Sequence, residues 1–242
     1  MNHLLEFQNV EKHFSGLIAV NNVNFSVDRG EVLGLLGPNG SGKTTLLNMI
    51  SGALRPTSGT INLNGSRISG LSPNQIAHKG IARTFQLVRC LPSLSVSENV
   101  IAALTFGKEK LWGQEAKDRA LHELKFVGLG DRANEAVSSL TYIDQKRLEL
   151  ARALAANPDV LLLDEWLAGL NPAELTAGIN LIHSLQNTGT TIILVEHIME
   201  AVRALCHRCI VMNAGSIIAD DTTAVALENP EVIQAYLGVP DA

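Results

Sequence analysis

The sequence predicts an α/β fold with a helical insertion in its middle. Short apolar runs, which are typical of buried strands, alternate with helical patterns near both ends of the 242-residue chain. Between about residues 93 and 154 the pattern is helical instead. The chain is long enough for one large domain or two small lobes with a sizeable core.

The composition argues against several classes of protein. A net charge of −5 does not favour a nucleic-acid groove. Residues 1–10 lack the basic region and long apolar core of a signal peptide. No apolar run approaches the roughly 20 residues that are needed to cross a bilayer. We therefore expect a soluble protein that can still lie against a membrane partner.

The three cysteines, Cys90, Cys206 and Cys209, are expected to be free thiols. An odd number of cysteines in a chain without an export signal indicates a reducing compartment. Cys206 and Cys209 have the C-x-x-C spacing, but the sequence has no second pair and only His207 is close by. We therefore expect thiols near the start of a strand rather than a zinc or redox site.

The expected elements can be placed along the chain from local patterns. In the first thirty residues, which should form antiparallel strands, Val23, Phe25 and Val27 alternate toward one face. In the insertion, Ser95 and Glu98 form a capping-box pair ahead of a helix. Further strands are expected at 31–37, 59–65, 160–165 and 191–197, and further helices at 43–54, 114–127, from Asn171 onward, at 198–206 and, broken once, at 221–238.

Residues 37–45, with the sequence GPNGSGKTT, carry the most specific motif in the chain. They match G-x-x-x-x-G-K-[ST] between a buried strand and a helix, which is where this motif binds phosphate. Glycines let backbone N–H groups close around phosphates, and the helix N-terminus adds partial positive charge. We expect Lys43 to reach the β- and γ-phosphates and the Thr44 hydroxyl to bind Mg²⁺. The expected nucleotide-binding residues of this loop are Gly37, Pro38, Asn39, Gly40, Ser41, Gly42, Lys43, Thr44 and Thr45.

Two adjacent acids, Asp164 and Glu165, follow the apolar run of residues 160–163. The carboxyl ends of strands are where open α/β sheets bind ligands. We expect Asp164 to hold Mg²⁺ and Glu165 to polarise the water that attacks the γ-phosphate. The alternative, that one acid merely caps a loop, is disfavoured because the chain also carries a phosphate loop.

On these motifs the chain resembles the ATP-binding subunits of ABC transporters almost from end to end. The resemblance implies a P-loop NTPase core of the RecA-like type, with an N-terminal antiparallel β subdomain and an inserted helical subdomain. The chain would be one ABC ATP-binding domain, 1–242. Its helical signature subdomain would span 93–154, and 1–92 together with 155–242 would form the β subdomain, the α/β core and the C-terminal helices.

The resemblance implies three further site residues. Gln86 in RTFQ is similar to the glutamine with which the family contacts Mg²⁺ and water. His197 in ILVEH is similar to the histidine that faces the γ-phosphate, so that Glu165, His197 and Gln86 would be catalytic. Phe14 lies where the family stacks an aromatic ring on adenine. The implied Mg²⁺ ligands are Thr44, Gln86 and Asp164.

The signature segment, residues 140–145, departs from the family pattern. Thr141, Tyr142 and Ile143 lie where serine and two glycines are usual, and in the family this segment binds the ATP that is held by the partner's phosphate loop. We expect a helix from Gln145 onward, with the bulky Tyr142 and Ile143 in front of it. Ile143 would then place a branched side chain where backbone and phosphate nearly touch. The chain would bind ATP and yet complete its partner's site poorly.

Two other departures are Trp166, where proline is usual, and Asp221, where glycine is usual. Within the family, the stretches GIARTFQ, LAGLNP, VEHIM and NPEVIQAYLG resemble the ATPases of branched-chain amino acid importers. The resemblance implies an ATPase that uses ATP and Mg²⁺ to drive uptake of branched-chain or related amino acids. It also implies membrane permease subunits, a second ATP-binding subunit and, indirectly, a solute-binding protein as partners. It implies no nucleic acid, and a cytoplasmic location at the inner face of the cell membrane.

Two other functions stay open from the sequence. One is a soluble, non-transport ABC protein acting on DNA or ribosomes, although such proteins typically have tandem cassettes, coiled coils or basic extensions that this sequence lacks. The other is an ATP-binding module with a degenerate signature and little turnover, which Ile143 favours. For the transport function, residues 87–99 are expected to face the membrane partner, because they follow Gln86 and are apolar for a loop. The alternative is that Leu91 and Leu94 in this segment pack under the helical insertion.

Overall fold

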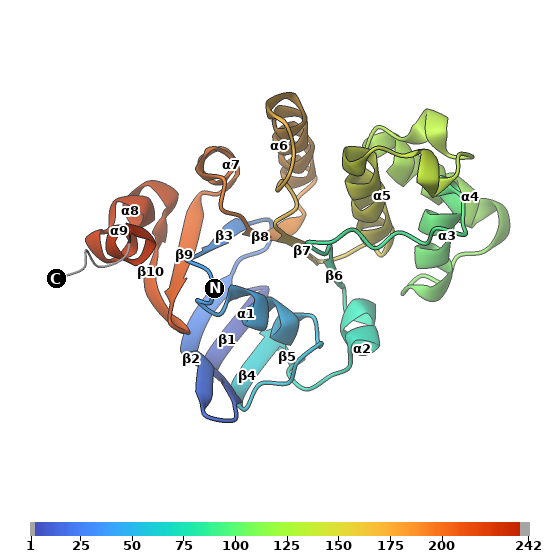
Figure 1. Ribbon diagram of the computed structural model, residues 1–242. Coiled ribbons are helices and arrows are strands. Elements are labelled where there is room, and N and C mark those ends of the chain that lie inside the picture. Colours follow the sequence, from blue (N-terminus) through green and yellow to red (C-terminus); the bar gives the residue numbers. More distant parts are fainter. Residues whose placement is uncertain (1–2, 238–242) are drawn as a thin grey trace.

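A computed structural model describes residues 3–237 and contains two β-sheets with helices around them (Figure 1). The first sheet is antiparallel and has the strand order β2-β1-β4-β5. The second has the order β10-β9-β3-β8-β7-β6 and is parallel except for β10. The strands are β1 (Leu5–Phe14), β2 (Leu17–Val27), β3 (Val32–Leu36), β4 (Ser58–Leu63), β5 (Ser66–Arg67), β6 (Ile81–Arg83), β7 (Val160–Asp164), β8 (Thr191–Val195), β9 (Arg208–Asn213) and β10 (Ser216–Thr222).

The helices lie between and beyond these strands. Helices α6 and α7 lie over the six-stranded sheet, α8 and α9 beside β10, and α3 to α5 form a group set apart from both sheets (Figure 1). The helices are α1 (Lys43–Ile50), α2 (Pro73–His78), α3 (Val96–Phe106), α4 (Gly113–Phe126), α5 (Tyr142–Ala155), α6 (Pro172–Asn187), α7 (Met199–Leu205), α8 (Thr223–Glu228) and α9 (Pro230–Leu237). No helix among residues 3–237 has the length and apolar character required to cross a membrane.

Alternation along the buried strands gives the molecule one apolar core on each face of the parallel sheet. In β7, Val160 and Leu162 pack with β1, β2, β4 and α1, whereas Leu161 and Leu163 pack with α6, α7 and the inserted helices. All five residues of β3, β7 and β8 are buried, as expected for strands covered on both sides. This burial fixes the carboxyl ends of three neighbouring strands along one edge, where the candidate site lies.

The predicted fold class and most of the predicted elements are confirmed. The antiparallel strands put Val23, Phe25 and Val27 in the interior, and the rings of Phe7 and Phe25 stack with their centroids 3.9 Å apart. The capping boxes at Ser95 and at Asn171 are both present. The C-terminal helical segment breaks once, between α8 and α9, and its last predicted residue lies outside the described residues.

Two predicted helix ends require correction, and several elements were not predicted. Helix α5 begins at Tyr142, so Tyr142 and Ile143 form its first turn rather than preceding it. Helix α1 ends at Ile50, four residues earlier than predicted. The sequence did not predict α2, β5 and β6, which are short, or β10, which is only partly buried. The three cysteines are free, as predicted.

Candidate nucleotide and catalytic site

The phosphate loop, residues 37–45, joins the end of β3 to the start of α1. Two of its glycines are required by close contacts. A Cβ on Gly37 would collide with the carbonyl oxygen of Met212, and one on Gly42 would lie 2.6 Å from that of Ala19, with φ positive at both positions. The loop therefore curls tightly and leads directly into the N-terminus of α1, where free backbone N–H groups attract anions.

Lys43 lies across this loop. Its Nζ donates hydrogen bonds to the carbonyl oxygens of Gly37 at 2.6 Å and Pro38 at 2.9 Å, and to Ser41 Oγ at 3.4 Å. Burial lowers the pKa of Lys43, while the nearby carboxylates of Glu165 and Asp164 act in the opposite direction. The ammonium group is thus held between the loop backbone and two acids, a position suited to a polyphosphate.

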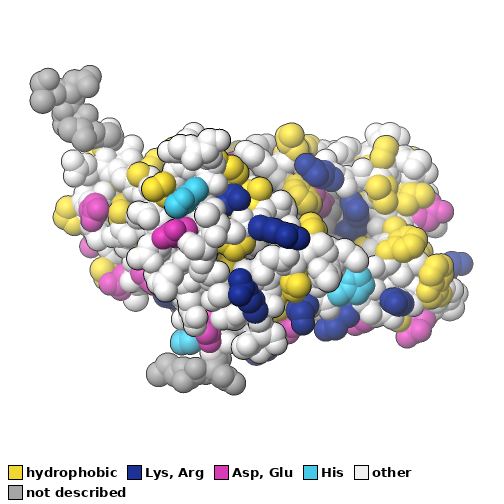
Figure 2. Space-filling model, turned by 90° about the horizontal axis from the view of Figure 1, so that it is seen from below, with side chains coloured by type: hydrophobic (Ala, Val, Ile, Leu, Met, Phe, Trp, Pro, Cys, Tyr) yellow, Lys and Arg dark blue, Asp and Glu magenta, His cyan; other side chains and the backbone are white. Residues whose placement is uncertain are grey.

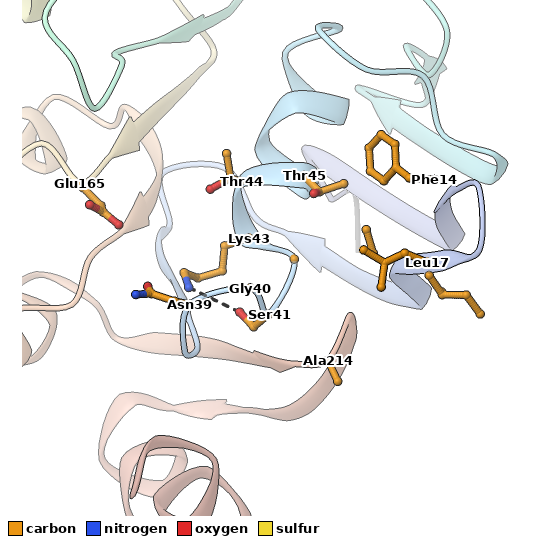
Figure 3. Close-up of a pocket in the computed structure, with 13 residues that line it drawn as sticks. Phe14, Leu17, Asn39, Gly40, Ser41, Lys43, Thr44, Thr45, Glu165 and Ala214 are labelled. Carbon is orange, nitrogen blue, oxygen red and sulfur yellow. Dashed lines mark hydrogen bonds between the residues drawn. The ribbon is translucent and has the colours of Figure 1, made fainter. Parts of the chain in front are cut away.

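A cavity of about 560 Å³ opens over the loop (Figure 3). Phe14 and Glu165 lie at opposite ends of this cavity, with Lys43 and Thr44 between them (Figure 3). The other lining residues are Leu17, Ile18, Ala19, Asn39, Gly40, Ser41, Gly42, Thr45 and Ala214. The aromatic and apolar end of the cavity suits a nucleotide base, its cationic middle suits a chain of phosphates, and its acidic end suits a water molecule.

The apolar end of the cavity is formed by the first hairpin. Phe14 ends β1 and Leu17 begins β2, and both side chains are exposed. The Lys12 ammonium lies 5.0 Å from the centre of the Phe14 ring. Phe14 was predicted from the sequence, whereas Leu17 and Ile18 were not, because only the tight hairpin brings these two residues beside the phosphate loop.

Asp164 ends β7 and pairs with an arginine that the sequence analysis did not single out. Its Oδ2 lies 2.7 Å from Arg83 of β6, and both side chains are almost fully buried. Arg83 also donates to Asn48 of α1 at 2.7 Å. Arg83 therefore fixes the Asp164 carboxylate against the helix that carries Thr44. This ion pair uses Oδ2 of Asp164 and does not use Oδ1.

Glu165 and Gln86 contact each other directly. Gln86 Nε2 donates to Glu165 Oε2 at 2.7 Å. Glu165 has a left-handed backbone, with φ of 48°, and its N–H donates to the carbonyl oxygen of Val195 at 2.9 Å. A non-glycine residue in this conformation is uncommon and costs roughly 1–3 kcal/mol unless its surroundings enforce it. The structure thus brings together two of the three residues that were predicted to be catalytic.

His197 is the third of these residues and lies just after β8. It is exposed and does not line the cavity. The preceding residue, Glu196, is buried and accepts a hydrogen bond from the backbone N–H of Leu167 at 2.7 Å. Burial raises the pKa of Glu196. Because β7 and β8 pair in register from Val160↔Thr191 to Asp164↔Val195, His197 leaves the same sheet edge as Glu165.

The donor set at this edge fits Mg²⁺. Thr44, Gln86 and Asp164 offer a hydroxyl, an amide carbonyl and a carboxylate oxygen, which are the hard ligands that Mg²⁺ prefers. Gln86 uses its NH₂ group on Glu165, so its carbonyl oxygen stays available. Residues 3–237 contain no group of three or more His, Cys, Asp or Glu side chains that could hold a metal ion. A Mg²⁺ ion bound here would take its remaining ligands from nucleotide phosphates and water.

The signature residues lie in the helical group, away from the cavity of the same chain. Thr141 is the N-cap of α5 and accepts a hydrogen bond from the N–H of Asp144. The Tyr142 side chain is 48% exposed, whereas that of Ile143 is only 8% exposed. Ile143 is therefore turned into the chain's own interior, and Tyr142 is the bulky side chain that the surface presents.

The fold and this site define a P-loop nucleotide-binding ATPase. The sequence matches the ABC transporter family over residues 20–168. It is also 41% identical to the high-affinity branched-chain amino acid transport ATP-binding protein LivG of Escherichia coli K12, over 97% of this chain and 98% of LivG. The protein belongs to the ABC transporter family and is one of its ATP-binding ATPases.

Other relatives give the same family. The branched-chain amino acid transport protein BraF of Pseudomonas aeruginosa is 38% identical over 97% of this chain and 98% of BraF. The ADP conformation of the ATP-binding cassette MJ1267 has a TM-score of 0.89 and 30% identity, covering 99% of this chain and all of that one. A dimeric post-hydrolysis state of the ATP-binding cassette MJ0796, bound to ADP and Pi, has a TM-score of 0.80 and 29% identity. The match covers 90% of this chain and 98% of the MJ0796 chain.

Proposed function

We propose that this protein hydrolyses ATP to drive import of branched-chain or related amino acids through membrane permease subunits. The observation that carries the proposal is the contact of Gln86 with Glu165 at the rim of the cavity over the phosphate loop. The names of the relatives LivG and BraF support the solute class. The MJ0796 dimer supports a second ATP-binding subunit as partner. If the transporter is an importer, it works with a solute-binding protein, and this ATPase lies at the inner face of the membrane.

In this proposal the residues divide the work along the cavity. Phe14 stacks on adenine, and the phosphate loop binds the phosphates. Glu165 polarises the water for in-line attack, and His197 faces the γ-phosphate. Mg²⁺, held by Thr44, Gln86 and Asp164, would neutralise the charge on the phosphates. The buried Arg83 keeps Asp164 in place for that role.

The signature segment acts across the dimer. Thr141, Tyr142 and Ile143 would approach the ATP on the phosphate loop of a second subunit, with the N-terminus of α5 directed at the γ-phosphate. Because Tyr142 is exposed beside Thr141, its ring would lie at the rim of that composite site. The helical group, residues 93–154, would be the subdomain that carries the signature.

Uptake by cells that carry the transporter tests the solute class. Cells that express this chain with its permease and binding protein should accumulate radiolabelled leucine, isoleucine or valine, and cells with the Glu165→Gln variant should not. Accumulation that is equal in both strains would contradict a role for this ATPase. Accumulation of an unrelated solute alone would contradict the proposed solute class and leave the ATPase assignment in place.

A further inference from the structure

A buried lysine connects the signature helix to the loop that carries Glu165. Lys146 lies in the second turn of α5 and is only 1% exposed. Its Nζ donates to the carbonyl oxygen of Trp166 at 2.8 Å and to that of Glu165 at 3.4 Å. The donors therefore act on the backbone of the loop after β7 and not on its side chains.

The contact is reciprocal. The indole Nε1 of Trp166 donates back to the carbonyl oxygen of Lys146 at 3.2 Å, and Trp166 is also buried. The Tyr142 ring lies 5.0 Å from the Lys146 ammonium, so one face of the cation is covered by an aromatic ring. Two departures from the usual family sequence, Tyr142 and Trp166, thus surround one lysine.

A buried charge such as that of Lys146 is an energetically costly way to hold α5 against the loop after β7. Among the described residues no carboxylate lies within ion-pair distance of its Nζ. A buried cation that is paired only with carbonyl groups and a ring pays a large desolvation cost. A well-packed apolar side chain would join α5 to the core at lower cost. This points to a positional role for the ammonium group.

The position that it holds is strained. The Glu165 backbone is left-handed, and three contacts oppose its relaxation: its N–H donates to Val195, and its carbonyl oxygen accepts from Ala168 at 3.1 Å and from Lys146. Strained residues at functional sites persist when their surroundings over-determine them. Of these three contacts, only the one from Lys146 comes from the helical group.

We propose that Lys146 is a positioning residue that holds Glu165 in the geometry for ATP hydrolysis. This inference rests on the proposed role of Glu165 as the base. Because Lys146 lies five residues after the cap Thr141 on the same helix, it also links two sites. The end of α5 that approaches the partner's nucleotide is rigidly joined to the base of this chain's own site.

The Lys146→Met variant tests the proposal in the full-length chain assembled with its permease. Methionine keeps an unbranched apolar stem and removes the three donors. We expect kcat for ATP to fall by about 10- to 100-fold, since misplacement of a catalytic group by about 1 Å can cost 10²-fold. The Kd for ATP should change less than about twofold, because the Lys146 ammonium bonds to the loop after β7 and makes no hydrogen bond to the phosphate loop.

Two comparisons separate positioning from structural damage. Arg147→Met makes the same change one residue later on α5, where the side chain pairs with Asp144 instead, and it should leave kcat nearly unchanged. Lys146→Arg keeps a cation that can donate to two carbonyls and should recover most of the activity. An equal loss in Arg147→Met and Lys146→Met would overturn the proposal.

A double-mutant cycle distinguishes the failure of this inference from the failure of its premise. If Lys146 acts through Glu165, then adding Lys146→Met to Glu165→Gln should cost no further rate. Multiplicative losses in the double variant would overturn the positioning role. If Glu165→Gln alone leaves kcat unchanged, the base assignment fails instead. Should Lys146→Met not fold, Lys146→Leu also removes the donors and supplies the same comparison, and a kcat for it equal to wild type overturns the proposal.

Discussion

The hydroxyl of Tyr236 accepts a hydrogen bond from the backbone N–H of Gly37 at 2.8 Å. This contact joins α9, near the end of the described chain, to the first residue of the phosphate loop. Burial raises the pKa of the Tyr236 hydroxyl above its ordinary value. The C-terminal helix therefore supports the nucleotide site, a role that the apolar pattern of the tail does not reveal.

Tyr236→Phe should weaken ATP binding without unfolding the chain. The ring still packs, while Gly37 loses its acceptor, which is worth about 0.5–1.5 kcal/mol or roughly 2- to 12-fold in Kd. Titration with a fluorescent nucleotide measures the change. The matched control is Ile233→Ala, since Ile233 is exposed on the same helix, and it should bind ATP normally. Unaltered affinity in Tyr236→Phe would show that the hydroxyl does not shape the loop.

Glu149 should make stability fall as pH rises toward neutrality. Burial raises its pKa to about 7, against the hydrogen bond from the Arg89 N–H and the charges of Arg152 and Lys146. Between pH 4.5 and about 7 the native state keeps this proton after the unfolded chain has lost it. The unfolded state is therefore favoured progressively through this window, by up to about 3 kcal/mol.

Glu149→Gln removes this titration. We expect the variant to be more stable than wild type at pH 8 and to show a flatter profile from pH 5 to 8 in urea denaturation. Parallel profiles for the two proteins would show that Glu149 ionises normally in the folded chain.

Leu87→Cys should cross-link to a permease loop. Leu87 follows Gln86 and is exposed, while the neighbouring Arg89 is tied to α5 through Glu149 and Arg152. Figure 2 shows exposed apolar side chains on the right-hand side of the view, and in the helical group Phe106 and Trp112 are 77% and 67% exposed. A cysteine at this position would face the partner expected from an importer.

The cross-linking needs two controls. Cys90 should first be replaced by serine, because this native thiol lies three residues away. Val225→Cys, exposed on α8, reports the far end of the molecule. Adducts from Val225→Cys alone would place the permease on the other side.

Ile143→Gly should lower the stability of the protein and leave the ATPase rate of the assembled transporter nearly unchanged. The Ile143 side chain is buried in its own subunit, so it does not stand between the partner's phosphate and the signature backbone, as the sequence had suggested. Glycine leaves a cavity and weakens the first turn of α5. Ile143→Ala keeps the helix propensity and isolates the cavity effect in urea denaturation. A clearly higher ATPase rate in either variant would show that Ile143 does hinder the partner's phosphate.

Local signals explain what the sequence predicted correctly. The phosphate loop, the two buried strands beside it and the caps Ser95 and Asn171 each depend on a few adjacent residues, so the pattern alone is sufficient. These elements fixed the expected place of Lys43 and Asp164. The match to the ABC family then agrees with the fold that they imply.

The missed features depend on contacts between distant segments. Arg83 is 81 residues from its partner Asp164, and Tyr236 is 199 from Gly37. The start of α5 was misplaced for a different reason, because bulky residues in a first turn are poor helix formers by propensity alone. Within the helix, the Tyr142 ring lies beside the ammonium of Lys146 one turn later, and Thr141 caps the first turn.

The ATPase rate of the Glu165→Gln variant in the assembled transporter tests the central claim most directly. Glutamine keeps the size of the side chain and removes the base, so we predict a rate lower by about 10²- to 10⁴-fold with ATP affinity unchanged. Lys43→Ala serves as the contrasting variant, since it should lose affinity itself. A Glu165→Gln protein that hydrolyses ATP at the wild-type rate would contradict the account.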